Sequence, residues 1–189
     1  HGASTTNGYK AEARSMAKLM CGSTSRNLIR VFFLQNKLKS QFPTSDTHIK
    51  NIHVIGAGIM GGDIASWCAL KGFNVTLQDR SSEDIAPALK RAEKLFAKKI
   101  RNNSLLEKTR SRLAEDLLGD GVVNADLIIE AIYENLEAKK DLYKKIETNM
   151  KSSAILATNT SSILLEDLRV DLKQPEKFIG LHFFNPVSQ

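Results

Sequence analysis

The stretch Val-Ile-Gly-Ala-Gly-Ile-Met-Gly at residues 54–61 decides the fold of this chain. It completes a short apolar run from Lys50 to Ile55, and β-branched runs of this length are typical of a buried strand. Its three glycines have the spacing Gly-x-Gly-x-x-Gly. Gly56 permits a tight turn, Gly58 lets the backbone approach a pyrophosphate, and Gly61 lets the following helix pack closely on the sheet.

The residues that follow fit the same unit. A helix from about Gly58 to Lys71 points its N-terminus at the phosphates, where free N–H groups and the helix dipole favour an anion. Asn74 to Gln78 is typical of a second strand, and Asp79 at its tip, 18 residues after Gly61, is placed to bind an adenosine ribose. These elements in register predict a dinucleotide-binding site. The alternative is a glycine-rich turn beside a surface aspartate.

Asp79 also bears on which dinucleotide binds. Its carboxylate repels the 2′-phosphate of NADP, so NAD is the predicted cofactor. Arg80 follows directly and keeps NADP open as the alternative, because an arginine pairs readily with a phosphate. More often, an arginine at this point stacks on the adenine or lies in solvent.

Length and composition limit the class of protein. A chain of 189 residues, with 42% hydrophobic and 25% charged residues, is typical of one globular domain with an appendage. No apolar run approaches the roughly 18 residues of a membrane span, so none is predicted. The two cysteines, Cys21 and Cys68, lie far apart and indicate free thiols in a reducing compartment. No metal site is predicted.

The positive charge of the chain, formally +6, is concentrated in one segment. Between residues 90 and 112, two acids stand against nine basic residues: Lys90, Arg91, Lys94, Lys98, Lys99, Arg101, Lys108, Arg110 and Arg112. Apolar residues recur there at helical spacing, which predicts one or two amphipathic helices with a cationic outer face. The face is either solvated or a contact for a phosphorylated substrate. Nucleic acid fits less well, because the one aromatic residue, Phe96, lies on the apolar side.

The chain divides into an appendage, residues 1–48, and an α/β domain, residues 49–189. In the appendage, Ala11 to Met20 and about Ser23 to Lys39 have helical character, and turn residues mark Gln41 to Thr47 as a linker. The second helix carries an unusually broad apolar surface. Surfaces of this kind seldom stay exposed, so we expect it to be covered or disordered.

The α/β domain alternates strands with helices. After the basic segment, strands are predicted at Asp126–Ala131, Ala154–Asn159 and Phe178–Phe184, with a helix from Glu134 to Met150. This alternation indicates a Rossmann-type, doubly wound parallel sheet with right-handed crossovers, preceded by a helical linker.

Polar residues follow three of the predicted strands, at the edge where ligands bind in such sheets. They are Glu134, Asn159 to Ser162, and His182 to Pro186. Each has an ordinary structural explanation, as a helix cap, a turn before proline, or a buried histidine of the kind predicted for His53. His182 differs because it lies beside a nucleotide site, where a neutral imidazole is the usual base for an alcohol proton.

Four motifs in this order and spacing carry a family resemblance. They are Gly-Ala-Gly-Ile-Met-Gly at 56–61, Ile-Glu-Ala-Ile-Tyr-Glu-Asn-Leu-Glu-Ala-Lys at 129–139, Asn-Thr-Ser-Ser at 159–162 and Gly-Leu-His-Phe-Phe-Asn-Pro at 180–186. Over residues 49–189 the chain resembles the L-3-hydroxyacyl-CoA dehydrogenases of fatty acid β-oxidation. Ala11 to Leu38 resembles the helical segment that joins the enoyl-CoA hydratase and dehydrogenase parts of the multifunctional β-oxidation α subunit.

The resemblance implies NAD-dependent oxidation of (S)-3-hydroxyacyl-CoA to 3-ketoacyl-CoA. His182 would be the catalytic base that takes the proton of the 3-hydroxyl, and Ser161 and Asn185 would hold the nicotinamide and the oxygen of the substrate. The residues that would line the NAD site are Gly56, Gly58, Ile59, Met60, Gly61, Asp79, Ile132, Tyr133, Glu134 and Lys139, with Ser161 and Asn185.

The resemblance also implies partners and a location. The substrate would be an acyl-CoA, with the cationic helices near the CoA phosphates. The full-length protein would be oligomeric, with a thiolase subunit as a partner. A bacterial cytoplasm is the implied location, with mitochondria and peroxisomes as the alternatives.

The chain departs from the family at its C-terminus. It stops at Gln189, before the glutamate that orients the histidine of the family and before the helical domain that covers the substrate. The chain alone is therefore expected to bind NAD but to be a poor catalyst or none. Two other functions stay open: another NAD-dependent β-hydroxyacid dehydrogenase, and a non-catalytic, crystallin-like homologue.

Overall fold

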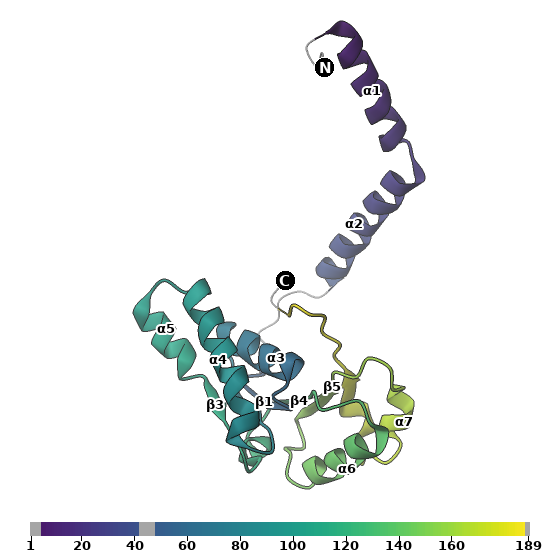
Figure 1. Cartoon of the computed structure of the whole chain (residues 1–189). Helices are drawn as coiled ribbons and strands as arrows, with labels where there is room; N and C mark the ends of the chain where they lie inside the picture. Colours follow the sequence, from purple (N-terminus) through teal and green to yellow (C-terminus); the bar gives the residue numbers. More distant parts are fainter. Residues whose placement is uncertain (1–4, 42–47, 188–189) are drawn as a thin grey trace. The chain divides into compact units, whose positions relative to one another are not determined.

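The structure, a computed structural model, describes residues 5–41 and 48–187 of the chain (Figure 1). The chain forms two compact units, residues 1–47 and residues 48–189. The first is helical, and the second is an α/β sheet domain. Within the described ranges, no helix is both long enough and apolar enough to cross a membrane.

The first unit consists of two helices, α1 (Thr6–Met20) and α2 (Ser23–Gln41). No residue of α1 is buried, and large apolar side chains of α2 are open to solvent within this unit, with Phe33 64% exposed. The prediction of two helices with a break near Gly22 is confirmed. The predicted linker lies outside the described residues, apart from Gln41 at the end of α2.

The second unit is built on one sheet of six parallel strands. The strands are β1 (Asn51–Ile55), β2 (Asn74–Gln78), β3 (Leu113–Glu115), β4 (Leu127–Glu130), β5 (Ile155–Thr158) and β6 (Phe178–Gly180). The helices are α3 (Ile59–Leu70), α4 (Ser82–Lys99), α5 (Asn103–Arg110), α6 (Leu136–Glu147) and α7 (Leu165–Arg169), with 3-10 turns η1 (Asp120–Val123) and η2 (Pro175–Lys177).

The strand order is β3-β2-β1-β4-β5-β6. The chain therefore moves outward from β1 to β3 and then crosses back to β4, on the other side of β1. This order confirms the predicted Rossmann-type, doubly wound sheet. The direction of winding reverses between β1 and β4, and in such sheets a ligand binds beyond the carboxyl ends of the strands at that point.

Each face of the sheet has its own core, because alternate side chains of a strand point to opposite faces. On one face, Val54 and Ile129 pack with residues of α3 and α4. On the other face, Ile128 and Leu156 pack with residues of α6 and α7. The sheet thus lies between two layers of helices (Figure 1).

The turn between β1 and α3 depends on two glycines. Gly56 has a φ of +103°, and a Cβ there would lie 2.6 Å from the Ala131 carbonyl oxygen. A Cβ on Gly61 would lie 1.8 Å from the Gly56 carbonyl oxygen. At Gly58, by contrast, a Cβ would meet nothing within 4 Å. Gly56 and Gly61 therefore allow the packing of β1, α3 and the end of β4, whereas Gly58 borders open space.

Three features of the sheet domain refine or correct the sequence predictions. The basic segment forms two helices, because the Asn102 side chain starts α5 by accepting a hydrogen bond from the Leu105 N–H at 2.9 Å. The short elements β3 and α7 are absent from the predictions. The last predicted strand is too long, since β6 ends at Gly180 and residues 181–187 leave the sheet.

His53 in β1 is a core residue, as predicted. Its side chain is fully buried, with Nδ1 2.7 Å from Thr76 Oγ1 and Nε2 2.9 Å from Gln78 Oε1. Burial lowers the pKa of His53, although the bond to Gln78 and the nearby Asp116 carboxylate act in the opposite direction. The ring is therefore neutral near neutral pH and serves to join β1 to β2.

The two cysteines are free thiols in different surroundings. Cys21 is exposed, directly after α1. Cys68 is half-buried in α3, and burial raises the pKa of its thiol to about 11. The Cys68 thiol is therefore protonated at neutral pH, in keeping with the small apolar role predicted for it.

Asp126 fastens the start of β4 to the start of β1. Its Oδ2 accepts hydrogen bonds from the Lys50 and Asn51 N–H groups, both at 2.9 Å, and its Oδ1 accepts one from Lys151 Nζ at 2.9 Å. The bonds from Asn51, Lys50 and Lys151 lower the pKa of Asp126 from 3.8 to about 2. Because the folded-state pKa is the lower one, this stabilisation is complete above pH 3.8 and is lost as the pH falls towards 2.

We expect Asp126→Asn to lower the free energy of unfolding by about 1–3 kcal/mol near pH 6, because two N–H donors and an ammonium lose a charged acceptor. Urea unfolding at pH 6 and pH 3 measures the effect. At pH 3 the gap between the variant and the unmodified protein is smaller, since the latter has lost part of the same stabilisation. An equal gap at both pH values would contradict this role for Asp126.

Candidate functional site

A cleft of about 510 Å³ opens at the carboxyl ends of β1, β2 and β4. Its lining residues are Ile55, Gly56, Gly58, Gln78, Asp79, Arg80, Leu117, Ala131, Ile132, Tyr133, Ala138 and Leu142. Five of the residues predicted for an NAD site are among them: Gly56, Gly58, Asp79, Ile132 and Tyr133. A cleft of this volume is in the range of small-molecule and cofactor sites, and it lies where the winding of the sheet reverses.

The glycine loop gives the cleft an anion-binding end. Gly58 is the N-cap of α3 and has no side chain to cap the first N–H groups of the helix. Those groups, with the positive end of the helix dipole, favour a phosphate. A Cβ on Gly58 would project into open space, so the glycine leaves room for a ligand to approach the backbone. Both observations fit a pyrophosphate at this loop.

Asp79 ties the end of β2 to the glycine loop. Its Oδ2 accepts a hydrogen bond from the Ala57 N–H at 2.6 Å, and its Oδ1 accepts one from the Arg80 N–H at 2.8 Å. An ionised carboxylate has about four lone-pair sites, so each oxygen keeps one for a ribose hydroxyl. The Arg80 side chain is 88% exposed, with Nε 3.9 Å from both Asp79 and Asp84.

The other seven residues predicted for the NAD site lie outside the lining of this cleft: Ile59, Met60, Gly61, Glu134, Lys139, Ser161 and Asn185. Ile59 is 62% exposed at the start of α3, and Met60 packs against the first core. Gly61 is buried within α3, against Gly56. Lys139 is 1% exposed and does not line the cleft, because its ammonium is held in the interior, 2.6 Å from Glu130 Oε1.

Glu134 holds the turn at residues 160–162. Its Oε1 accepts hydrogen bonds from the Thr160 hydroxyl and from the Ser161 and Ser162 N–H groups, the last two at 2.9 and 3.0 Å. Burial alone would raise the pKa of Glu134, but the bonds from Thr160, Ser162 and Ser161 and the nearby Lys139 lower it to about 2. Glu134 is therefore ionised at neutral pH and fixes Ser161 beside the end of β4.

The segment that carries His182 and Asn185 is joined to the same edge of the sheet. Asn159 Oδ1 accepts a hydrogen bond from the Phe183 N–H at 2.8 Å, directly beyond β5. Both His182 and Asn185 are exposed, and the His182 ring meets the Phe184 ring edge-on, with centroids 4.8 Å apart. The polar clusters at 134, 159–162 and 182–185 are thus linked to one another by hydrogen bonds.

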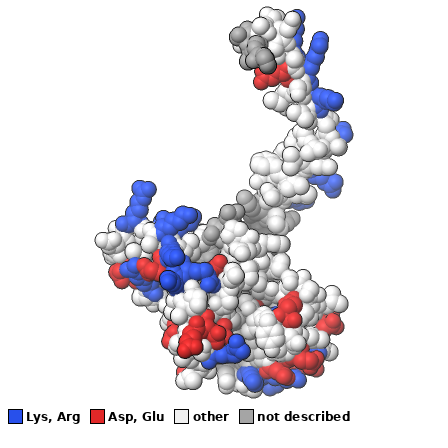
Figure 2. Space-filling model, viewed as in Figure 1, with Lys and Arg blue, Asp and Glu red and all other residues white. Residues whose placement is uncertain are grey.

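The basic side chains of residues 90–112 gather over α4 and α5 (Figure 2). Some of them serve the fold. Arg110 pairs with Glu93 and Glu107, which joins α5 to α4. Arg91 donates to the Gly58 carbonyl at 3.0 Å and so supports the glycine loop from outside. Others are exposed and available to a ligand: Lys90, Lys94, Lys98, Lys99, Arg101 and Lys108.

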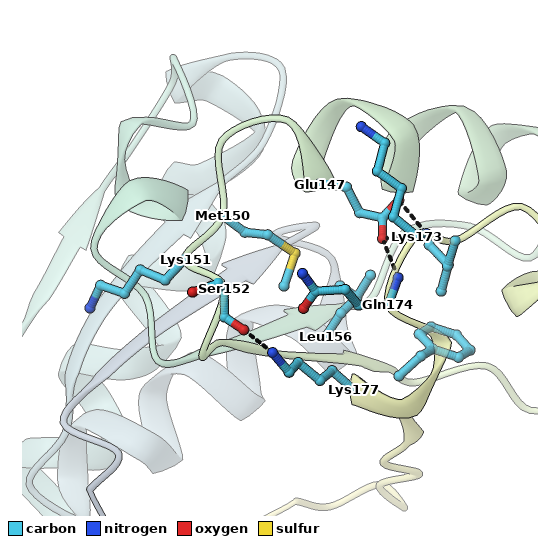
Figure 3. Close-up of a pocket in the computed structure, with 10 residues that line it drawn as sticks. Glu147, Met150, Lys151, Ser152, Leu156, Lys173, Gln174 and Lys177 are labelled. Carbon is cyan, nitrogen blue, oxygen red and sulfur yellow. Dashed lines mark hydrogen bonds between the residues drawn. The ribbon is translucent and has the colours of Figure 1, made fainter.

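A second cavity, of about 50 Å³, lies at the opposite edge of the sheet, beside the starts of β5 and β6. Figure 3 shows the Lys173 N–H bonded to Glu147 and the Lys177 ammonium bonded to the Ser152 carbonyl at its border. Gln174 Oε1 is buried there and accepts no hydrogen bond from any described residue. The space suits a few water molecules and is too small for a nucleotide.

Several lining residues of the cleft are absent from the sequence predictions. Leu117 follows β3, which is too short to be recognised by periodicity. Ala138 and Leu142 lie four residues apart in α6, so they share one side of that helix. This spacing was available as a signal, but it does not distinguish a side that faces a ligand from one that faces the core.

The chain is similar to known proteins over most of its length. Residues 51–189 match the family model described as the NAD binding domain of 3-hydroxyacyl-CoA dehydrogenase. A fatty acid oxidation complex subunit alpha from Ectopseudomonas oleovorans is 38% identical over 94% of this chain and 26% of that protein. The chain thus spans about a quarter of the length of the curated relatives it matches.

Solved structures agree with this result. The 3-hydroxybutyryl-CoA dehydrogenase of Escherichia coli K12 has a TM-score of 0.71 and 34% identity, over 75% of this chain and 31% of that one. The (S)-3-hydroxybutyryl-CoA dehydrogenase of Ralstonia eutropha has a TM-score of 0.68 and 31% identity, over 74% and 50% of the two chains. The chain therefore belongs to the family of the NAD-binding domain of 3-hydroxyacyl-CoA dehydrogenases.

Proposed function

We propose that the chain is the NAD-binding part of a larger enzyme that oxidises (S)-3-hydroxyacyl-CoA to 3-ketoacyl-CoA in fatty acid β-oxidation. The observation that carries the proposal is the set of links at the carboxyl edge of the sheet. Glu134 binds the 160–162 turn, and Asn159 binds the segment of His182 and Asn185. These bonds join residues of three family motifs, and the fourth motif, the glycine loop, lines the nucleotide cleft together with Ile132 and Tyr133.

The cofactor is NAD, which the family binds at this domain. The α3 N-terminus with Gly58 holds the pyrophosphate, and Asp79 binds the adenosine ribose. Asp79 also disfavours the 2′-phosphate of NADP. Ile132 and Tyr133 form the opposite wall of the cleft. Ser161 and Asn185, which lie outside the lining of the cleft, would hold the nicotinamide and the substrate oxygen.

When bound, NAD supplies the acceptor for the hydride that leaves C3 of the substrate. His182 removes the proton of the 3-hydroxyl in the same step, because a neutral imidazole accepts a proton near neutral pH. The backbone N–H of Ser161 is bonded to Glu134, so the backbone that carries this side chain is held in place before the substrate arrives. Such orientation removes part of the entropy cost of the reaction.

The substrate and the partners follow from the same proposal. Exposed lysines of α4 and α5 offer a contact for the CoA phosphates, since charged phosphates favour clustered ammonium groups. The curated relatives are named as subunits of a complex, which supports an oligomeric protein, and we propose a thiolase subunit as its partner from the family resemblance alone. Those relatives are bacterial proteins, which supports a location in the cytoplasm of a bacterium.

We expect Gly58→Val to abolish NADH binding without unfolding the protein. A side chain at position 58 enters open space in the free protein, so the fold is retained, but it occupies the place of the pyrophosphate. Isothermal titration with NADH and thermal unfolding measure the two effects. Gly61→Ala is the contrasting control, because a Cβ there would lie 1.8 Å from the Gly56 carbonyl oxygen and the protein should unfold at a lower temperature.

Unchanged NADH affinity in a folded Gly58→Val variant would count against the cofactor site. A titration of the unmodified protein in which NADPH bound more tightly than NADH would reverse the assignment of Asp79 as the residue that selects NAD.

We expect His182→Gln to lower kcat by about 10²–10⁴-fold, the usual contribution of a general base. NADH affinity should be unchanged, because in the proposed mechanism His182 contacts the hydroxyl of the substrate and not the cofactor. The measurement is NADH-dependent reduction of acetoacetyl-CoA, followed by absorbance. It should be made on a chain extended to the length of its relatives, since the present chain spans 26% of them. A His182→Gln variant with undiminished kcat would remove His182 from the mechanism.

A further inference from the structure

A buried carboxylate lies at the centre of the hydrogen bonds that organise the carboxyl edge. Glu130, the last residue of β4, is 0% exposed. Its Oε1 accepts hydrogen bonds from the Ile132 N–H at 2.8 Å and from Lys139 Nζ at 2.6 Å. Its Oε2 accepts bonds from Tyr143 Oη at 2.6 Å and from Thr158 Oγ1 at 2.8 Å. Donors from β5, α6 and the loop after β4 thus converge on one side chain.

Two routes lead from Glu130 to the turn at residues 160–162. In the first, Lys139 bridges Glu130 to Glu134, with Nζ 3.3 Å from Glu134 Oε2, and Glu134 accepts the N–H groups of the turn. In the second, Thr158 Oγ1 donates to Glu130 and accepts the Thr160 N–H at 3.3 Å. Both routes end at the turn that carries Ser161.

Stability alone is a poor explanation for this arrangement. Burying a carboxylate and an ammonium costs so much desolvation energy that an apolar replacement of similar volume is often as stable. The buried charges instead select one conformation of the surrounding loops, because all the donors can bond to Glu130 only in that conformation. The loop from 131 to 134 lines the cofactor cleft with Ala131, Ile132 and Tyr133, and Glu134 of the same loop holds the turn from 160 to 162.

We propose that Glu130 is a positioning residue for the nicotinamide half of the cofactor site. It acts through Lys139 and Thr158, and it touches neither cofactor nor substrate. The proposal rests on the proposed function of the chain as an NAD-binding dehydrogenase domain. In this proposal Lys139 does not contact the cofactor. Its ammonium pairs with Glu134, and Glu134 in turn bonds to the backbone of Ser161.

The proposal predicts that the two halves of the cofactor respond differently to a change at Glu130. Glu130→Gln keeps the size of the side chain but removes its charge. NADH affinity should fall about tenfold, the equivalent of one hydrogen bond to a charged group. Affinity for ADP, which lacks the nicotinamide and its ribose, should be unchanged. Titration calorimetry of the purified protein with NADH and with ADP gives both values.

Asp126→Asn is the matched control. Asp126 directly precedes the other end of β4, and it accepts two backbone hydrogen bonds and one from a lysine. The substitution Asp126→Asn should lower the stability of the fold without altering the carboxyl edge of the sheet, where the cofactor binds. The ratio of NADH to ADP affinity should therefore stay at the value of the unmodified protein. Tyr143→Phe is a milder second variant, which removes one of the four donors and should weaken NADH binding with ADP binding unchanged.

Equal weakening of NADH and ADP in Glu130→Gln would show a general structural effect and overturn the proposal. An unchanged affinity ratio in Tyr143→Phe overturns it if Glu130→Gln does not fold. A changed ratio in Asp126→Asn would also overturn it, because the effect would not be specific to the carboxyl edge. If the unmodified protein bound neither NADH nor ADP, the proposed function itself would fail instead.

Discussion

The structure depends on one close approach of backbone to backbone, where the first helix of the sheet domain meets the end of the first strand. Gly61 lies so near the Gly56 carbonyl that no side chain fits between them, and a side chain on Gly56 would likewise meet the backbone of Ala131 after β4. This contact fixes the angle of α3 against β1 and β4 together. The same contact determines where the N-terminus of α3 lies, and therefore where the anion-binding end of the cleft lies.

The parts of the fold that the sequence predicts are those with strong local signals. β1, α3 and β2 follow from apolar runs and glycine spacing, and their order already implies the parallel sheet. The four motifs predict the family, which the comparisons confirm. The three residues of β3 carry no such signal, because a strand that short at the edge of a sheet needs neither alternation nor a continuous apolar run.

Lys139 shows why the site was harder to predict than the fold. A lysine on a helix is nearly always exposed, so nothing in the sequence around Lys139 itself places it in the interior. Its burial depends on Glu130, which the pairing of β1 with β4 brings to the end of the sheet. The carboxylate in the apolar run Leu-Ile-Ile-Glu is a local sign that a cation or several hydrogen-bond donors are buried nearby.

The two cysteines have a practical consequence for spectroscopy. The thiolate is the form that reacts with maleimides, and the raised pKa of Cys68 keeps that thiol protonated at neutral pH, whereas Cys21 is exposed. A fluorescent dye therefore attaches selectively to the helical unit without mutagenesis. The only tryptophan, Trp67, belongs to α3 in the sheet domain. Energy transfer from Trp67 to a dye on Cys21 thus measures the distance between the two units without any substitution in the chain.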